Sequence, residues 1–249
     1  MFYASQIIGR RDCQEDSYAI EELDVIDENG TELMQVFVVA DGMGGHSSGE
    51  IASRVAVDAF MRSVESGELW SPQRLPKALT EADNAIALEI SQNSTLAGMG
   101  TTLLGVTRRG DELAWISVGD SLLLLFRGSE LEQLNEDHSM LPVLIESAEA
   151  KGQARSVAYR DPRRHRLRSA LIGIAPKLVD TGTVELCPQD ILLVATDGLA
   201  TLDMIELKVL LTENYGKAPE SLASEIIAKM LEREALQQDN ATLIVYGHV

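Results

Sequence analysis

The chain has 249 residues, 45% of them hydrophobic, so it can bury a sizeable core and is not expected to be disordered. Its 21 basic and 39 acidic residues give a net charge of −18 at pH 7, which disfavours nucleic acids and anionic membranes as general partners. The sequence has no basic-then-apolar leader and no apolar run of bilayer length, and Cys13 and Cys187 lack the spacing of a metal site or a disulfide framework. We therefore expect a cytoplasmic protein with reduced thiols.

The predicted elements run as strands, two helices, strands, two helices and a last strand. Apolar runs and alternating residues predict a hairpin over 17–40 and the following strands: Tyr3–Ile8, Ser17–Ile20, Val36–Ala40, Thr101–Thr107, Leu113–Val118, Ser121–Arg127, Ile191–Ala195 and Ala241–Tyr246. Apolar residues at helical spacing predict the helices: Ser47–Ser66, a segment that opens at Ser71-Pro72, Leu141–Ala150, Met204–Leu211 and Pro219–Glu234. Strands grouped apart from helices favour an α+β fold with two antiparallel sheets flanked by helix pairs.

The stretch Val36–His46 combines the features of a buried strand and of a cation site. Its apolar run stops at Asp41, and three glycines follow within four positions, which lets the backbone turn sharply and lie close to a bound group. A carboxylate at a strand end, beside exposed carbonyls and the start of a helix, suits a hard cation such as magnesium or manganese. The alternative interpretation is that Asp41-Gly42 is an ordinary hairpin turn.

Six acidic residues lie at or beside predicted strand ends or in a charged corner before a strand: Glu15, Asp16, Asp41, Asp120, Asp197 and Asp239. If these ends converge, the carboxylates repel one another unless divalent cations neutralise them. A pair of such ions activates water and binds a phosphoryl oxygen, and an arginine fork from Arg10 or Arg11 suits a phosphate dianion. The set then points to metal-assisted hydrolysis of a phosphoester.

Seven short motifs follow one another across nearly the whole chain: RDCQEDS at 11–17, DGMGGH at 41–46, GTT at 100–102, GDS at 119–121, DHS at 137–139, DG at 197–198 and DN at 239–240. In this order they resemble the motifs of the metal-dependent protein serine/threonine phosphatases, the type 2C or PPM family, in its bacterial branch. The resemblance implies one phosphatase domain over 1–249 with a variable flap at about 139–180. It also implies a central antiparallel β-sandwich flanked by helix pairs, in four α-β-β-α layers.

The resemblance further implies a role for each site residue. Asp41 would bridge two manganese or magnesium ions, and the Gly42 carbonyl would complete one shell. Asp197 and Asp239 would ligate the first ion, and Glu15 and Asp16 would hold the second, directly or through water. Asp120 with Asp197 would form a third, weaker site. Arg11 would bind the substrate phosphate, and a metal-bridged hydroxide would hydrolyse phosphoserine and phosphothreonine monoesters.

The sequence departs from the family pattern at three positions. Gln14 replaces the usual asparagine, Leu122 replaces an arginine that many members carry, and Met43 stands where the eukaryotic branch has a histidine. His46, which opens the helix, would support the ligands without binding a metal, or would serve the structure alone.

The implied partners are phosphorylated protein substrates and a cognate serine/threonine kinase, with no nucleic acid and no membrane, and the chain is expected to be a monomer. One alternative is a catalytically weak, phosphoprotein-binding regulatory module that retains the metal pocket, for which Leu122 is mild support. A remoter alternative is a metal-dependent phosphodiesterase or nuclease, which the net charge disfavours.

The segment 151–168 is basic in an acidic chain, since it carries seven of the 21 basic residues. It falls in the region of the variable flap. We hypothesise that it helps to recognise acidic or multiply phosphorylated protein segments. The alternative is a solvated loop that only compensates charge.

Overall fold

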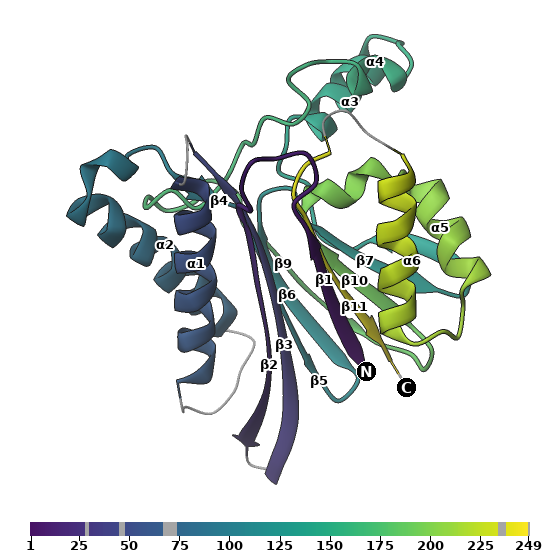
Figure 1. Ribbon diagram of the computed structural model, residues 1–249, viewed down its shortest axis with the longest axis horizontal. Coiled ribbons are helices and arrows are strands. Elements are labelled where there is room, and N and C mark those ends of the chain that lie inside the picture. Colours follow the sequence, from purple (N-terminus) through teal and green to yellow (C-terminus); the bar gives the residue numbers. More distant parts are fainter. Residues whose placement is uncertain (28–29, 45–47, 67–73, 234–237, 249) are drawn as a thin grey trace.

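The computed structural model describes residues 1–27, 30–44, 48–66, 74–233 and 238–248. His46, the cap at Ser47 and the helix start at Ser71-Pro72 lie outside these ranges. Two antiparallel sheets face each other (Figure 1). The first has the order β1 (Phe2–Ile7), β11 (Ala241–Gly247), β10 (Ile191–Ala195), β7 (Leu122–Arg127) and β8 (Glu130–Gln133). The second has the order β2 (Asp16–Asp27), β3 (Gly30–Met43), β5 (Leu103–Arg109), β6 (Glu112–Val118) and β9 (Asp180–Glu185), and β4 (Gly100–Thr101) pairs with β3.

A pair of helices covers the outer face of each sheet, so the predicted four-layer α-β-β-α architecture is confirmed (Figure 1). The second sheet is covered by α1 (Ser48–Glu65) and α2 (Arg74–Gln92), and the first by α5 (Met204–Glu213) and α6 (Pro219–Glu232). Two further helices, α3 (Leu141–Ala150) and α4 (Ser156–Tyr159), project beyond one end of the sandwich, and single 3₁₀ turns lie at η1 (Ser94–Leu96) and η2 (Asp197–Thr201). Among the described residues, no helix combines the length and the apolar character needed to cross a membrane.

The central strands explain why the layers hold together. In β3, Val36 and Val38 face the core beneath α1 and α2, whereas Phe37 and Val39 face the core between the two sheets. The same alternation in β10 sends Leu193 toward α5 and α6. Because both faces are covered, these strands read as continuous apolar runs, and alternate side chains fill two different cores.

The structure corrects one predicted boundary and adds elements. The strand predicted to stop at Asp41 continues through Met43, because Gly42 and Met43 pair with β4. Asp41-Gly42 is therefore strand and not a hairpin turn. The predicted short strand Ser17–Ile20 is part of a longer one, since β2 pairs with β3 along its whole length. The edge strands β8 and β9, which alternate between exposed and half-buried residues, have too weak an apolar signal to be predicted.

Candidate active site

The predicted acidic residues converge at one end of the sandwich. The register of β2 and β3 places Asp16 directly opposite Asp41. In the other sheet Ala195 pairs with Leu243, so the end of β10 and the start of β11 lie side by side. Asp197 follows the first of these strands and Asp239 precedes the second. The convergence that sequence spacing alone left open is thus a consequence of strand register.

The electrostatics of the carboxyl groups show how closely they lie together. Burial raises the pKa of Asp41 well above its usual value, and the charges of Asp197, Asp16, Asp120 and Asp239 raise it further. Burial and then Asp197 raise the pKa of Asp120 in the same way. Burial, followed by the charge of Asp239, also raises the pKa of Asp197, although a hydrogen bond shared with the Asp41 carboxyl opposes this shift. We call Glu15, Asp16, Asp41, Asp120, Asp197 and Asp239 the acidic pocket.

Asp16 is the most completely anchored member. Its Oδ2 accepts hydrogen bonds from the Thr196 hydroxyl at 2.7 Å and the Thr242 hydroxyl at 2.8 Å, and both threonines are buried. Burial nevertheless raises the pKa of Asp16 to about 7. Its other oxygen, Oδ1, is buried without a hydrogen-bond partner, as is Oδ1 of Asp197. Buried carboxylate oxygens without partners are costly unless a cation or a proton compensates them.

Asp41 is held through its backbone, which leaves its carboxylate to the pocket. The Asp41 N–H donates to the Thr102 hydroxyl at 2.9 Å, and the Asp41 carbonyl accepts from the Thr101 hydroxyl at 2.8 Å. The next residue must be glycine, because a Cβ on Gly42 would lie 2.0 Å from the carbonyl oxygen of Gly49 in α1. The threonines of the GTT motif are therefore positioning residues for Asp41, and both are buried.

The charged corner that carries Arg11 and Glu15 is tied to the start of β11 by Asn240. The side chain of Asn240 accepts from the Glu15 N–H at 2.8 Å and donates to the carbonyls of Ile8 and Cys13. Nη2 of Arg11 lies 2.5 Å from Oδ2 of Asp239, and Nη1 of Arg11 lies 3.9 Å from the Glu15 carboxylate. The Arg11 side chain remains half exposed, so it can reach a ligand in the pocket.

Two departures from the family pattern have structural explanations. Gln14 donates to the Ile7 carbonyl at 3.2 Å and accepts from the Asp16 N–H at 3.0 Å, so it links the end of β1 to the start of β2. Leu122 begins β7 and packs against the core beneath α5 and α6. Neither residue occupies the acidic pocket.

The GDS and DHS motifs form one buried unit beside Asp120. The Gly119 N–H donates to Nδ1 of His138 at 3.2 Å, and the His138 N–H donates to the Gly119 carbonyl at 3.0 Å. Gly119 has φ +111°, a conformation that favours glycine. Burial, followed by the charge of Arg168, lowers the pKa of His138, so this ring is a neutral acceptor that fixes the turn before Asp120.

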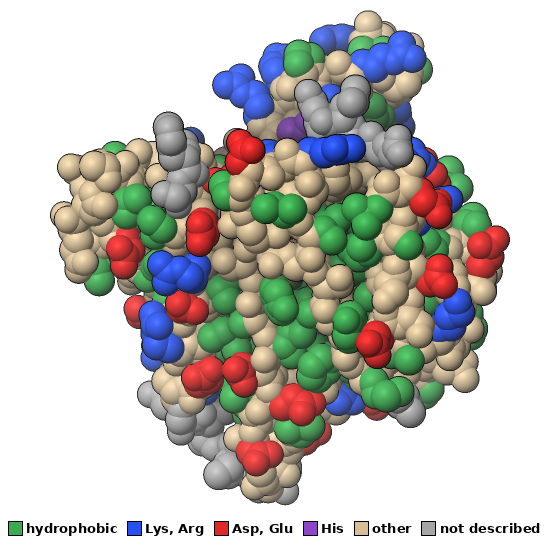
Figure 2. Space-filling view, in the orientation of Figure 1, with side chains coloured by type: hydrophobic (Ala, Val, Ile, Leu, Met, Phe, Trp, Pro, Cys, Tyr) green, Lys and Arg blue, Asp and Glu red, His purple; other side chains and the backbone are tan. Residues whose placement is uncertain are grey.

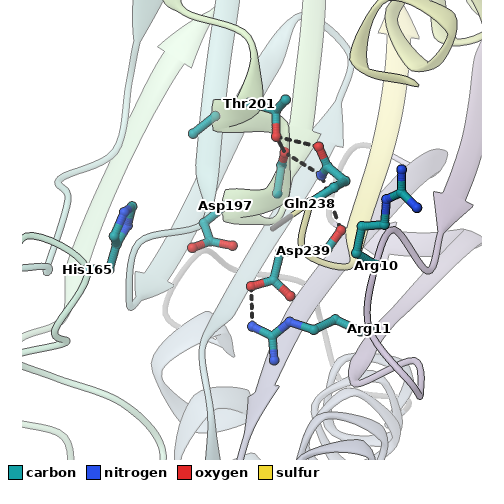
Figure 3. A pocket seen from close by; sticks show the side chains of 9 residues that line it. Arg10, Arg11, His165, Asp197, Thr201, Gln238 and Asp239 are labelled. Carbon is teal, nitrogen blue, oxygen red and sulfur yellow. Dashed lines mark hydrogen bonds and ion pairs between the residues drawn. The ribbon is translucent and has the colours of Figure 1, made fainter. Parts of the chain in front are cut away.

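A cavity of about 590 Å³ opens onto Asp197 and Asp239 (Figure 3). Arg11 and His165 lie on opposite sides of these two carboxylates, and Thr201 and Gln238 form another wall, where the threonine hydroxyl donates to Oε1 of the glutamine at 2.6 Å. Sequence reasoning missed His165, Thr201 and Gln238 as lining residues. His165 lies within the basic stretch of the flap, and no local spacing relates it to a strand end; only the tertiary fold places it here.

The donor set fits hard divalent cations. It consists of carboxylates and a backbone carbonyl, all oxygen ligands, and it includes the two orphaned buried oxygens of Asp16 and Asp197. Within the described residues, no three acidic, histidine or cysteine side chains are arranged to hold one ion between them. An ion here would therefore reach part of its carboxylate set through water and complete its shell with carbonyl oxygen, as magnesium, which keeps several waters, commonly does.

Comparisons with known proteins agree with this geometry. The family model described as protein phosphatase 2C matches residues 9–243. The serine/threonine phosphatase stp of Listeria welshimeri is 35% identical over 177 residues, which cover 67% of each chain. The structure is similar to that of the serine/threonine phosphatase PstP/Ppp of Mycobacterium tuberculosis, with a TM-score of 0.82, 25% identity, and coverage of 100% of this chain and 98% of that one. A structure of the catalytic domain of PstP with two manganese ions has a TM-score of 0.77 at 25% identity, over 98% of this chain and 96% of that one.

The fold and the oxygen-rich pocket define a metal-dependent phosphatase. The chain belongs to the protein phosphatase 2C family.

Proposed function

We propose that the acidic pocket hydrolyses phosphoserine and phosphothreonine monoesters in proteins with the help of divalent cations. The observation that carries the proposal is the convergence of six acidic residues from five chain segments, two of which present buried oxygens without a partner. A protein that only bound phosphate would be expected to line its pocket with donors and positive charge instead. The family and the serine/threonine phosphatases among its relatives support the reaction and the substrate class.

The cations would be shared among the members of the acidic pocket. Asp41 would ligate two ions together with the Gly42 carbonyl, Asp197 and Asp239 would complete the site of the first, and Glu15 and Asp16 that of the second. Oδ1 is the oxygen of Asp16 that remains for this purpose, because Oδ2 already accepts two hydroxyl hydrogen bonds. Asp120 with Asp197 would form a third, weaker site. When bound, such ions lower the pKa of water and neutralise charge on a phosphoryl group.

The protein itself supplies orientation around the reacting phosphate. Arg11 would bind two phosphoryl oxygens through its guanidinium fork, while Asp239 limits the directions in which that fork can point. Asn240 and Ser53 fix the backbone of Glu15, since the asparagine accepts from its N–H and the serine donates to its carbonyl at 2.6 Å. The geometry of the pocket is thus set before substrate arrives. Such preorganisation accounts for much of the rate enhancement of enzymes.

Hydrolysis of para-nitrophenyl phosphate and of a phosphothreonine peptide tests the proposal. We expect turnover of both with manganese, none with chelator, and a loss of at least about 100-fold in Asp239→Asn. Phosphopeptide binding without manganese-dependent turnover would contradict the proposal and favour a binding module. Turnover of a phosphodiester but not of these monoesters would contradict it in favour of a nuclease-type reaction.

We also propose that residues 1–249 form one phosphatase domain that acts in the cytoplasm as a monomer, against a cognate serine/threonine kinase. The similarity of PstP/Ppp over the whole chain supports the single domain. Light scattering of the purified chain tests the monomer, and dephosphorylation of kinase-treated cell extract tests the pairing with a kinase.

A further inference from the structure

The basic segment 151–168 stands out on the surface. It carries seven lysine and arginine residues and one acidic residue, Asp161, in a chain with a net charge of −18. In Figure 2 the lysine and arginine side chains gather on the protrusion formed by α3 and α4, whereas elsewhere on this face acidic and basic side chains are mixed. The protrusion lies at the same end of the sandwich as the end of β10 and the start of β11 (Figure 1). The neighbouring residues Asp197 and Asp239 line the cavity.

The segment is anchored where it returns to the sandwich. The Met140 N–H donates to the Arg166 carbonyl at 2.9 Å, and the Arg168 N–H donates to the His138 carbonyl at 2.8 Å. The Arg168 guanidinium adds a bond to the Ser139 carbonyl at 2.8 Å. These bonds attach the segment to the buried unit that holds Asp120, so the part around Arg166 has a fixed position relative to the pocket.

Three of the seven cations are occupied within the flap. Arg155 pairs with Glu149 at 2.5 Å, Arg163 pairs with Asp161 at 2.8 Å, and Arg168 binds backbone carbonyls. In the described part of the chain the other four have no ion-pair partner: Lys151, Arg160, Arg164 and Arg166. Arg160 and Arg166 are exposed and Arg164 is half-buried.

Two of the free cations, Arg164 and Arg166, flank a residue that lines the cavity. His165, between Arg164 and Arg166 in sequence, lines the cavity that contains Asp197 and Asp239. A protein segment whose phosphoresidue enters the cavity past His165 would lie close to these two arginines. Guanidinium groups bind carboxylates and phosphates through paired N–H donors. Outside 151–168 acidic residues outnumber basic ones, so an acidic segment is disfavoured over most of the remaining surface and favoured beside the flap.

We infer that Arg164 and Arg166, with Arg160, form a docking surface for acidic residues or a second phosphate that flank the phosphoresidue of a protein substrate. The inference rests on the proposed function and narrows its substrate class. The occupant is an acidic phosphopeptide segment. Arg155 and Arg163, which form ion pairs within the flap, stabilise its conformation and take no part in docking.

Two double variants with the same change in charge separate docking from a general electrostatic effect. R164Q/R166Q removes free cations, and R155Q/R163Q removes the same number of positive charges from paired positions. Each variant is assayed on two phosphothreonine peptides that differ only in carrying glutamate or glutamine at the flanking positions, and on para-nitrophenyl phosphate.

We expect R164Q/R166Q to raise KM for the glutamate peptide about three- to tenfold at low salt. Its kcat, and every constant for the glutamine peptide and the aryl phosphate, should change by about twofold or less, and R155Q/R163Q should change KM by no more than that. Unchanged aryl phosphate turnover shows that the variants fold. Equal effects of the two variants, or equal effects on the two peptides, would overturn the inference.

Fluorescence anisotropy of the labelled peptides in the presence of chelator provides a readout that does not depend on turnover. Tighter binding of the glutamate peptide, lost in R164Q/R166Q, would support docking even if the proposed hydrolysis failed. Equal binding of both peptides by the wild-type chain, or arginine-dependent binding of polyuridine or anionic vesicles in preference to the glutamate peptide, would overturn it.

Discussion

The acidic pocket draws its residues from five chain segments, whereas the basic segment 151–168 is one continuous run beside it. The pocket carboxylates are buried or half-buried, and strand register and hydrogen bonds to threonine hydroxyls hold them, as Asp16 and Asp41 show. The basic side chains are largely exposed, and the two that form ion pairs use carboxylates two or six residues away in sequence. The carboxylates of the acidic pocket repel one another, so the whole sandwich is needed to hold them together. The docking surface, in contrast, is formed by one continuous segment that is anchored to the sandwich.

The largest expected effect is on catalysis and comes from the centre of the pocket. Asp41→Asn removes a carboxylate that interacts with four other aspartates and should lower kcat/KM for a phosphothreonine peptide with manganese by at least about 100-fold. Asp12→Asn is the matched control, because Asp12 is exposed in the charged corner and carries the same charge. Comparable losses in the two variants would mean that net charge, not placement, matters.

Substitution of Arg11 tests whether the guanidinium at the edge of the pocket acts through its geometry and not only through its charge. Arg11→Ala should lower kcat/KM for para-nitrophenyl phosphate about tenfold or more, and Arg11→Lys should recover only part, because lysine lacks the fork. Arg10→Ala should cost less than about threefold, since the Arg10 guanidinium is directed away from Asp197 (Figure 3). A loss with Arg10→Ala as large as that with Arg11→Ala would contradict the assignment.

A change of backbone packing tests the claim that the sandwich positions the pocket. A Cβ on Gly198 would lie 2.0 Å from the Asn240 carbonyl oxygen, so Gly198→Ala should lower the free energy of unfolding by about 2 kcal/mol and displace Asp197. At Gly247 the nearest atom would be Pro219 Cγ at 3.6 Å, so Gly247→Ala should change stability by about 0.5 kcal/mol or less. Urea unfolding measures both, and a stable, active Gly198→Ala would show that the approach of these loops is not required.

The smallest effect concerns pH in the metal-free chain. Burial raises the pKa of Asp16 to about 7 and raises those of Asp41, Asp120 and Asp197 above their usual values. The folded chain then binds more protons than the unfolded chain, so stability is present at about pH 4 and is lost as pH rises toward 7. With chelator, Tm should fall by several degrees between pH 5 and pH 8, and manganese at pH 8 should restore it. A Tm that rises over this range with chelator would contradict the burial of these groups.

Much of this site could be predicted because its acidic residues carry local signals. A long apolar run followed by Asp-Gly identifies Asp41 and Asp197 as residues beside strand ends without any knowledge of the fold. The supporting residues could not be predicted, because Thr196 and Thr242 act on Asp16 across 180 and 226 residues of sequence. The edge strands β8 and β9 could not be predicted for a different reason. Their own sequences carry only a weak strand signal, and they form strands because they pair with β7 and β6.

In the flap, composition predicts the charge of the segment but not the interactions of its individual side chains. Composition revealed that 151–168 is basic, but not which cations are free, so Arg163 looked equivalent to Arg164 until its pairing with Asp161 was seen. His165 was missed as a lining residue of the cavity because only the fold of the flap brings it there.

The most direct test of the account is anomalous diffraction from crystals soaked in manganese. The account predicts two strong manganese peaks in the acidic pocket, both within ligand distance of Asp41 and flanked by Asp197 and Asp239 on one side and Glu15 and Asp16 on the other. Absence of manganese from the pocket, or peaks only at scattered surface carboxylates, would contradict it.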